Sequence, residues 1–165
     1  MFGNIIKSFG GHSHGSVLLA PLAGKVIPLS EVNDQLFAKG LLGQGVAMVP
    51  TGSRVVAPSH CKVEAIFPTG HAVALHTEEG LDVLIHIGLD TERLDGKFFK
   101  VHASVGDAVE KGDVIIEFDR EEISAAGFDV TVPILICNSV EFASIKGCIG
   151  DTVDELDQLV VAKAR

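Results

Sequence analysis

The sequence contains little that suits secretion, a membrane span or disulfide chemistry. None of its apolar runs approaches the roughly 20 residues that a membrane-spanning helix needs. Residues 10–15 are glycine, histidine and serine, and they interrupt the hydrophobic start of the chain, so it does not resemble a signal peptide. The 3 cysteines form no CxxC pair, which favours reduced thiols, and the apolar run before Cys137 predicts a buried side chain there. We expect a cytoplasmic protein with peripheral membrane contact at most.

Several reaction classes lack their signature motifs. The chain has no GxxxxGK[ST] phosphate-binding loop, no GxSxG nucleophile elbow and no HExxH zinc motif. Gly43–Gly45 lacks the rest of a dinucleotide-binding fingerprint. The formal net charge of −9 argues against nucleic acid and against anionic lipid, and it suits a basic protein partner.

The composition that is present favours β-structure. Short runs of β-branched residues lie between glycine, proline and aspartate, and this pattern predicts an all-β fold. Residues 1–16 are predicted to be a flexible tail, and residues 17–165 a single domain. Residues 30–42 are predicted to be a loop with a turn of helix. Asp119 is predicted to cap a short helix that ends at Gly127.

Two motifs each occur twice along the chain. Residues 19–26 match residues 56–63, which lie 37 positions later, and residues 105–110 match residues 149–154, which lie 44 positions later. Each copy has the pattern of a strand, a turn and a second strand. Two duplicated motifs predict an antiparallel β-sandwich or flattened barrel built by duplication, with short helical turns.

Two histidines lie on a predicted hairpin made of the strands 67–76 and 80–91. If the two glutamates between the strands form the turn, His71 and His86 face each other directly, with Cβ atoms roughly 4.5–5.5 Å apart. A bulge at Gly80 would shift the register by one residue and send the two rings to opposite faces of the sheet. The residues alone leave both arrangements open.

An adjacent pair of imidazoles could support phosphoryl chemistry. A neutral imidazole is a good nucleophile, and its ordinary pKa near 6.5 leaves it mostly unprotonated in the cell. The second imidazole could donate a hydrogen bond to an anion that forms on the first, and a phosphoryl group is such an anion. The same pair could instead hold zinc, with one more ligand from a partner.

Residues 84–91, with residues 68–72 upstream, resemble the glucose-family IIA protein of the bacterial phosphoenolpyruvate-dependent sugar phosphotransferase system. The resemblance extends from about Leu19 to the C-terminus and includes both duplicated motifs. It implies a duplicated all-β sandwich that acts as a phosphocarrier. We expect no cofactor and a monomer. Some family members also regulate other proteins according to their phosphorylation state.

The resemblance implies specific roles for four residues. His86 would be phosphorylated at Nε2 by the histidine of the carrier HPr, and it would pass the phosphoryl group to a cysteine of the IIB domain. His71 would contact that phosphoryl group, and the Thr69 hydroxyl would order the His71 ring. The backbone carbonyl of Gly88 would accept from His86 Nδ1 and thereby fix its tautomer. No metal is required, although His71 and His86 could bind zinc in a complex.

The resemblance also implies a partner-binding surface with acidic and apolar members. Its residues would be Asp34, Asp90, Phe37, Leu41, Leu42, Phe67 and Leu84. The sequence departs from the family pattern at several positions, including Gln44 in place of the usual aspartate and Glu92 in place of an apolar residue after Thr91. These departures leave the histidines intact and bear on partner choice.

Three other interpretations compete with the phosphocarrier. A biotinyl or lipoyl carrier shares the Gly-Asp turns, but Lys25 and Lys62 lack the neighbours that the modified lysine requires. A zinc endopeptidase on a duplicated barrel would need HxxxD, whereas Leu75 stands at that spacing from His71. A regulator that binds other proteins according to its phosphorylation state is compatible with the phosphocarrier.

Overall fold

The computed structural model describes residues 15–165. The predicted tail of residues 1–16 therefore lies almost entirely outside the described residues, and the first strand, β1 (Gly15–Leu19), already includes its last two positions. Within the described part of the chain, no helix is long and apolar enough to cross a membrane.

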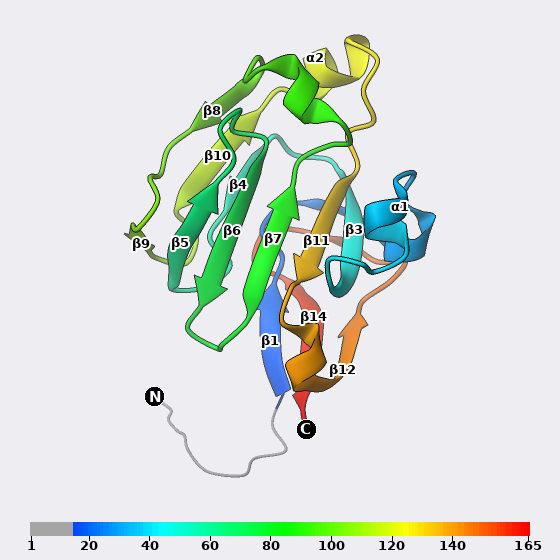
Figure 1. The fold of residues 1–165 in the computed structure, drawn as a ribbon, viewed down its shortest axis with the longest axis vertical. Helices are drawn as coiled ribbons and strands as arrows, with labels where there is room; N and C mark the ends of the chain where they lie inside the picture. Colours follow the sequence, from blue (N-terminus) through cyan, green and yellow to red (C-terminus); the bar gives the residue numbers. More distant parts are fainter. Residues whose placement is uncertain (1–14) are drawn as a thin grey trace.

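Three antiparallel sheets make up the fold (Figure 1). The largest has eight strands in the order β13 (Thr152–Val153), β2 (Gly24–Pro28), β3 (Gln44–Pro50), β11 (Val132–Ile136), β7 (Asp82–His86), β6 (Ala72–Thr77), β5 (Cys61–Ile66) and β9 (Ala108–Val109). A second sheet has the order β1, β14 (Gln158–Ala164) and β12 (Phe142–Gly147). A third has the order β4 (Arg54–Val56), β10 (Val114–Phe118) and β8 (Phe99–Val101). The predicted all-β class is confirmed, without a closed barrel.

The helical elements are short. They are the α-helices α1 (Gln35–Ala38) and α2 (Arg120–Ala125) and the 3-10 helices η1 (Leu29–Glu31), η2 (Thr91–Leu94) and η3 (Ser139–Glu141). As predicted, Asp119 caps α2, because its side chain accepts a hydrogen bond from the Glu122 N–H at 3.0 Å. The helical turn expected within residues 30–42 is α1.

The predicted duplication is visible in the strand pairing. β13 pairs with β2 at one end of the large sheet, where Val153 lies opposite Gly24. β9 pairs with β5 at the other end, where Val109 lies opposite Cys61. These partners are related by the 37- and 44-residue spacings of the two repeats. Each end of the large sheet therefore pairs one copy of the first repeat with one copy of the second.

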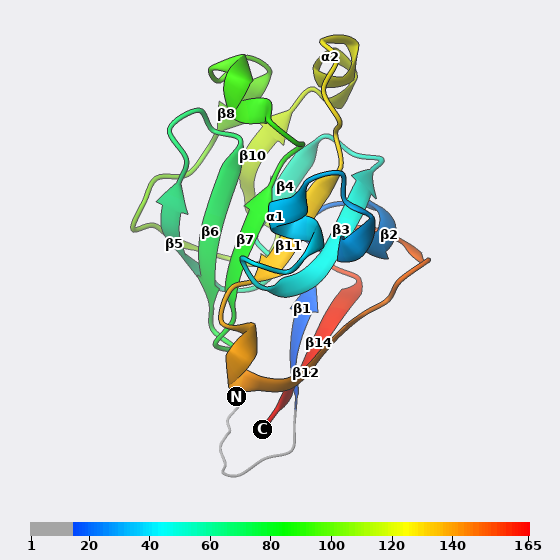
Figure 2. The same cartoon turned by 45° about the vertical axis from the view of Figure 1, so that its right-hand side comes forward.

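The central strands of the large sheet are covered on both faces. All five residues of β11 are buried, as expected for a strand with one face in the main core and the other under a second apolar layer. That second layer contains Phe37 of α1, packed with Ala47 of β3 and Leu135 of β11. In Figure 2, α1 lies in front of β11.

The prediction that Cys137 is buried is wrong. Its side chain is exposed, because β11 ends at Ile136 and the chain then turns toward η3. The apolar run continues one residue beyond the strand that buries it.

Candidate active site

The hairpin of β6 and β7 differs from the predicted register by one residue. The Thr77 N–H donates to the Leu81 carbonyl at 2.9 Å, which leaves a three-residue loop in which Gly80 has a φ of +91°. Ala72, rather than His71, therefore lies opposite His86. The two glutamates therefore do not form a two-residue turn. Gly80, with its positive φ, is the third residue of the loop.

The rings of His71 and His86 are nevertheless adjacent. Their centroids are 4.8 Å apart and their planes make an angle of 77°. His71 precedes the first residue of β6 and follows the turn of residues 67–70, so the alternation of side chains along the strand does not govern it. The expectation that a Gly80 bulge would separate the rings is thus wrong, although the register shift itself occurs.

The His86 ring is held in one tautomer by the backbone. Its Nδ1 lies 2.7 Å from the carbonyl oxygen of Gly88, and because a carbonyl only accepts, the Nδ1 must carry the proton. In the neutral ring the lone pair is then on Nε2. Gly88 has a φ of +78°, and a Cβ there would lie 2.6 Å from Thr91 Cγ2, so this bend requires glycine.

The His71 ring is also held by a polar neighbour. Thr69 Oγ1 lies 2.5 Å from His71 Nδ1, and the Phe67 ring meets the His71 ring edge-on at a centroid distance of 5.4 Å. A hydroxyl can donate or accept, so this hydrogen bond exists in either tautomer. The His71 ring therefore has a defined orientation, with Nε2 as its unengaged nitrogen.

Burial keeps both imidazoles neutral. His71 is 4% exposed and His86 is 9% exposed, so both rings lie just below the surface. Desolvation, reinforced by the neighbouring His86, lowers the pKa of His71 to about 4, against an opposing effect of Glu92. Desolvation also lowers the pKa of His86, against the Gly88 hydrogen bond and the charges of Glu92, Asp34 and Asp90.

Apolar side chains surround the pair on the side of α1. The centroids of the Phe37 and His86 rings are 5.1 Å apart. Asp34 caps α1, because its side chain accepts a hydrogen bond from the Leu36 N–H at 3.0 Å. Leu41 and Leu42 are exposed. These leucines follow Phe37 by four and five residues in the chain and expose apolar surface in the segment whose Phe37 contacts His86, which suits a docking protein.

The sequence-predicted site residues differ in how closely they approach the histidines. Contacts or charge effects on one of the two rings are found for Thr69, Gly88, Phe37, Phe67, Asp34 and Asp90. Leu84 lies on the same strand as His86 and packs in the second apolar layer. Leu36 is exposed and belongs to the same segment as Leu41.

Glu92 is the residue whose role sequence reasoning missed. Its carboxylate and the nitrogens of His71 and His86 lie within 4.8 Å of one another. The three groups offer ligand atoms that zinc accepts, since it binds imidazole nitrogen and carboxylate oxygen at about 2.0–2.2 Å. The signal was present as the replacement of an apolar residue by an acid directly after the histidine motif.

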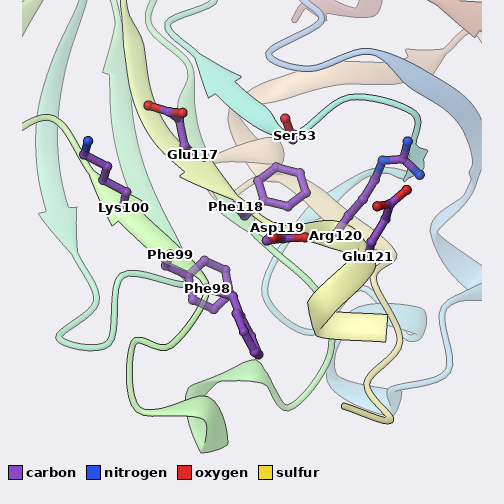
Figure 3. A pocket seen from close by; sticks show the side chains of 9 residues that line it. All are labelled: Ser53, Phe98, Phe99, Lys100, Glu117, Phe118, Asp119, Arg120 and Glu121. Carbon is purple, nitrogen blue, oxygen red and sulfur yellow. The ribbon is translucent and has the colours of Figure 1, made fainter. Parts of the chain in front are cut away.

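A separate cavity of about 590 Å³ lies between β8, β10 and the start of α2, and Figure 3 shows its lining. Phe98, Phe118 and Arg120 are among the side chains that line it, and neither His71 nor His86 does. The histidine pair therefore lies outside this cavity.

Comparison with known proteins agrees with this geometry. Residues 16–142 match the family model of the phosphoenolpyruvate-dependent sugar phosphotransferase system, EIIA 1. A glucose-specific EIIA component of Staphylococcus epidermidis is 43% identical over 128 residues, which cover 78% of this chain and 77% of the relative. The solved glucose permease IIA of Mycoplasma capricolum has a TM-score of 0.79 and 31% identity, covering 89% of this chain and 95% of that one.

Other relatives are much longer than this chain. A β-glucoside-specific EIIBCA component of Dickeya chrysanthemi is 44% identical over 153 residues, which cover 91% of this chain but 24% of the relative. The chain thus spans about a quarter of the length of that relative, in which an EIIA part is joined to EIIB and EIIC parts. On the combined evidence of sequence, fold and site, this chain belongs to the EIIA family of the phosphoenolpyruvate-dependent sugar phosphotransferase system.

Proposed function

We propose that this chain accepts a phosphoryl group from phospho-HPr on Nε2 of His86 and passes it to a cysteine of a IIB domain. Membership of the EIIA family supports a role in a phosphoryl relay. The observation that carries the finer proposal is the 2.7 Å hydrogen bond from His86 Nδ1 to Gly88, because it leaves Nε2 as the nucleophile.

In the accepting step, the lone pair on His86 Nε2 attacks phosphorus while the N–P bond of the donor phosphohistidine breaks. The proton stays on Nδ1, which donates it in a hydrogen bond to the Gly88 carbonyl oxygen, so no general base has to remove it. The lowered pKa of His86 supports this step, because the ring is neutral at cellular pH.

In the donating step, the cysteine thiolate attacks phosphorus and the N–P bond to His86 breaks. His71 stabilises the phosphoryl group in the phosphorylated protein by hydrogen bonding. If the Thr69 hydroxyl donates to His71 Nδ1, the His71 Nε2 carries a proton and can donate it in a hydrogen bond to a phosphoryl oxygen. Neither proposed step requires a metal.

The surface around the pair supports docking of HPr and of IIB. Asp34 and Asp90 place negative charge beside His86, which suits a basic partner, and Leu41 and Leu42 offer apolar contact. The EIIBCA relatives join EIIA to EIIB, which supports IIB as the acceptor. We further propose a cytoplasmic monomer that can also regulate other proteins by its phosphorylation state.

Incubation with phosphoenolpyruvate, enzyme I and HPr tests the proposal. The protein should gain one acid-labile phosphate. His86→Gln should abolish the labelling, whereas His71→Gln should retain it. His76→Gln is the matched control, because His76 is exposed and pairs with Asp82 away from the site. Wild-type protein that gains no phosphate, or His86→Gln protein that still does, would contradict the proposal.

A further inference from the structure

Glu92 is held beside the histidine pair by its neighbours in the chain. It is the second residue of η2, and the residue before it, Thr91, is fully buried with its hydroxyl donating to the Ile87 carbonyl at 2.5 Å. The Glu92 side chain is exposed, yet its carboxylate lies within 4.8 Å of ring nitrogens of both histidines. The anchoring of η2 therefore brings one acid to the edge where the two rings meet.

The charge of Glu92 acts on both rings. It opposes the lowering of the pKa of His71 and that of His86, whereas Asp34 and Asp90 oppose the lowering of the pKa of His86. A phosphoryl group on His86 would bring close to two negative charges to the same edge. Like charges a few ångströms apart repel. Glu92 therefore destabilises the phosphoryl group that His71 would stabilise by hydrogen bonding.

We propose that Glu92 raises the phosphoryl-transfer potential of phospho-His86: it makes phosphorylation by the donor less favourable and onward transfer more favourable. The proposal rests on the proposed function. His71 and Glu92 would then act with opposite sign on one phosphoryl group, the first by hydrogen bonding and the second by charge. With the dielectric of water, which suits an exposed carboxylate, one unit charge about 5 Å from a group of nearly two charges corresponds to about a tenfold change in an equilibrium constant.

An equilibrium measurement separates this effect from docking. Contacts between Glu92 and a basic partner would change the rates of transfer in both directions, but they leave the equilibrium between the free proteins unchanged. Phospho-HPr and the protein are therefore mixed and left to equilibrate, and the two phosphoproteins are quantified by phosphorus NMR. The measurement is made at low ionic strength and again in about 1 M KCl, where exposed charges are screened within about 3 Å.

Three variants give the proposal its test. Glu92→Gln should raise the equilibrium constant for phosphorylation of this chain about tenfold at low salt, and the increase should shrink in high salt. Glu92→Asp keeps the charge and should stay near the wild type. Glu121→Gln removes one exposed charge from α2 and should change nothing.

The outcomes that overturn the proposal are distinct from a failure of the proposed function. Wild-type protein that takes no phosphoryl group from phospho-HPr would refute the proposed function itself. If the wild type is phosphorylated, the inference fails where Glu92→Gln stays within about twofold of it at low salt. It also fails where the increase persists undiminished in high salt, or where Glu92→Asp behaves like Glu92→Gln, since either result would indicate a role of shape rather than charge.

Discussion

The Nδ1 of His86 and the carbonyl oxygen of Gly88 lie 2.7 Å apart, in a bend that begins where β7 ends. The bend needs the φ of +78° at Gly88 and close contact with Thr91, which in turn is tied to the Ile87 carbonyl. The backbone that follows His86 therefore sets which of its ring nitrogens lacks a proton.

Gly88→Ala should destabilise the protein and displace this carbonyl. A Cβ at position 88 would meet Thr91 Cγ2 at 2.6 Å and the Asp129 carbonyl oxygen at 3.0 Å, in addition to the cost of a positive φ. We expect a loss of about 2–4 kcal/mol in the free energy of unfolding, measured by chemical denaturation. The matched control is Gly80→Ala, because Gly80 has a φ of +91° but no atom within 4 Å of its added Cβ. Equal losses for the two variants would contradict the steric account.

His71→Gln should separate the two steps of the relay. The variant retains His86 and its hydrogen bond to Gly88, so it should still accept a phosphoryl group from HPr. Onward transfer to IIB should fall by about 100-fold or more, because a preorganised donor to the transferring group is lost. Single-turnover transfer from the purified phosphoprotein measures this step. Unchanged donation, or an equal loss in both steps, would count against a role specific to the onward transfer.

Leu41→Ala should weaken docking without affecting the fold. Leu41 is 66% exposed in the free protein, so its truncation should leave the free energy of unfolding nearly unchanged. If a partner buries this side chain, kcat/KM for transfer from HPr should fall about 5- to 20-fold. Val140→Ala provides the control, since Val140 is 77% exposed and lies in η3. Equal kinetics for the two variants would remove Leu41 from the partner surface.

The stability of the protein should depend on pH through His71. Its pKa is about 4 in the folded state and near 6.5 when unfolded, so between these values the unfolded state binds more protons. The free energy of unfolding should therefore rise with pH across this window and level off above it. His71 contributes at most about 2 kcal/mol to the rise between about pH 5 and pH 7. Denaturation of the wild type and of His71→Gln at several pH values measures it, and parallel curves would contradict the lowered pKa.

Much of the fold could be predicted because short sequence motifs, each present twice, determine it locally. The two duplicated motifs share turn residues and apolar alternation, and the strands β13 and β9 pair as equivalents at opposite ends of the large sheet. The cap of α2 by Asp119 was equally local, since it needs only an acid before the helix and a free N–H three residues later. Such features depend on neighbours in the sequence, so the sequence reveals them.

The geometry of the histidine pair was less predictable. One additional loop residue, Gly80, shifted the ladder, and strand alternation then predicted rings on opposite faces. The rings meet only because His71 lies beyond the end of β6, in a turn whose conformation depends on tertiary contacts. The approach of Glu92 likewise depends on how η2 packs after the bend at Gly88, which no periodicity in the sequence encodes.

In the proposed relay, Nε2 of His86 is the atom that carries the phosphoryl group. Nitrogen-15 NMR of the histidine rings, recorded before and after phosphorylation, tests it most directly. We predict a neutral His86 ring with its proton on Nδ1 before phosphorylation, and phosphorus coupled to Nε2 of the same ring afterwards. A free ring protonated on Nε2, or phosphorus attached to His71 or to Nδ1 of His86, would contradict the account.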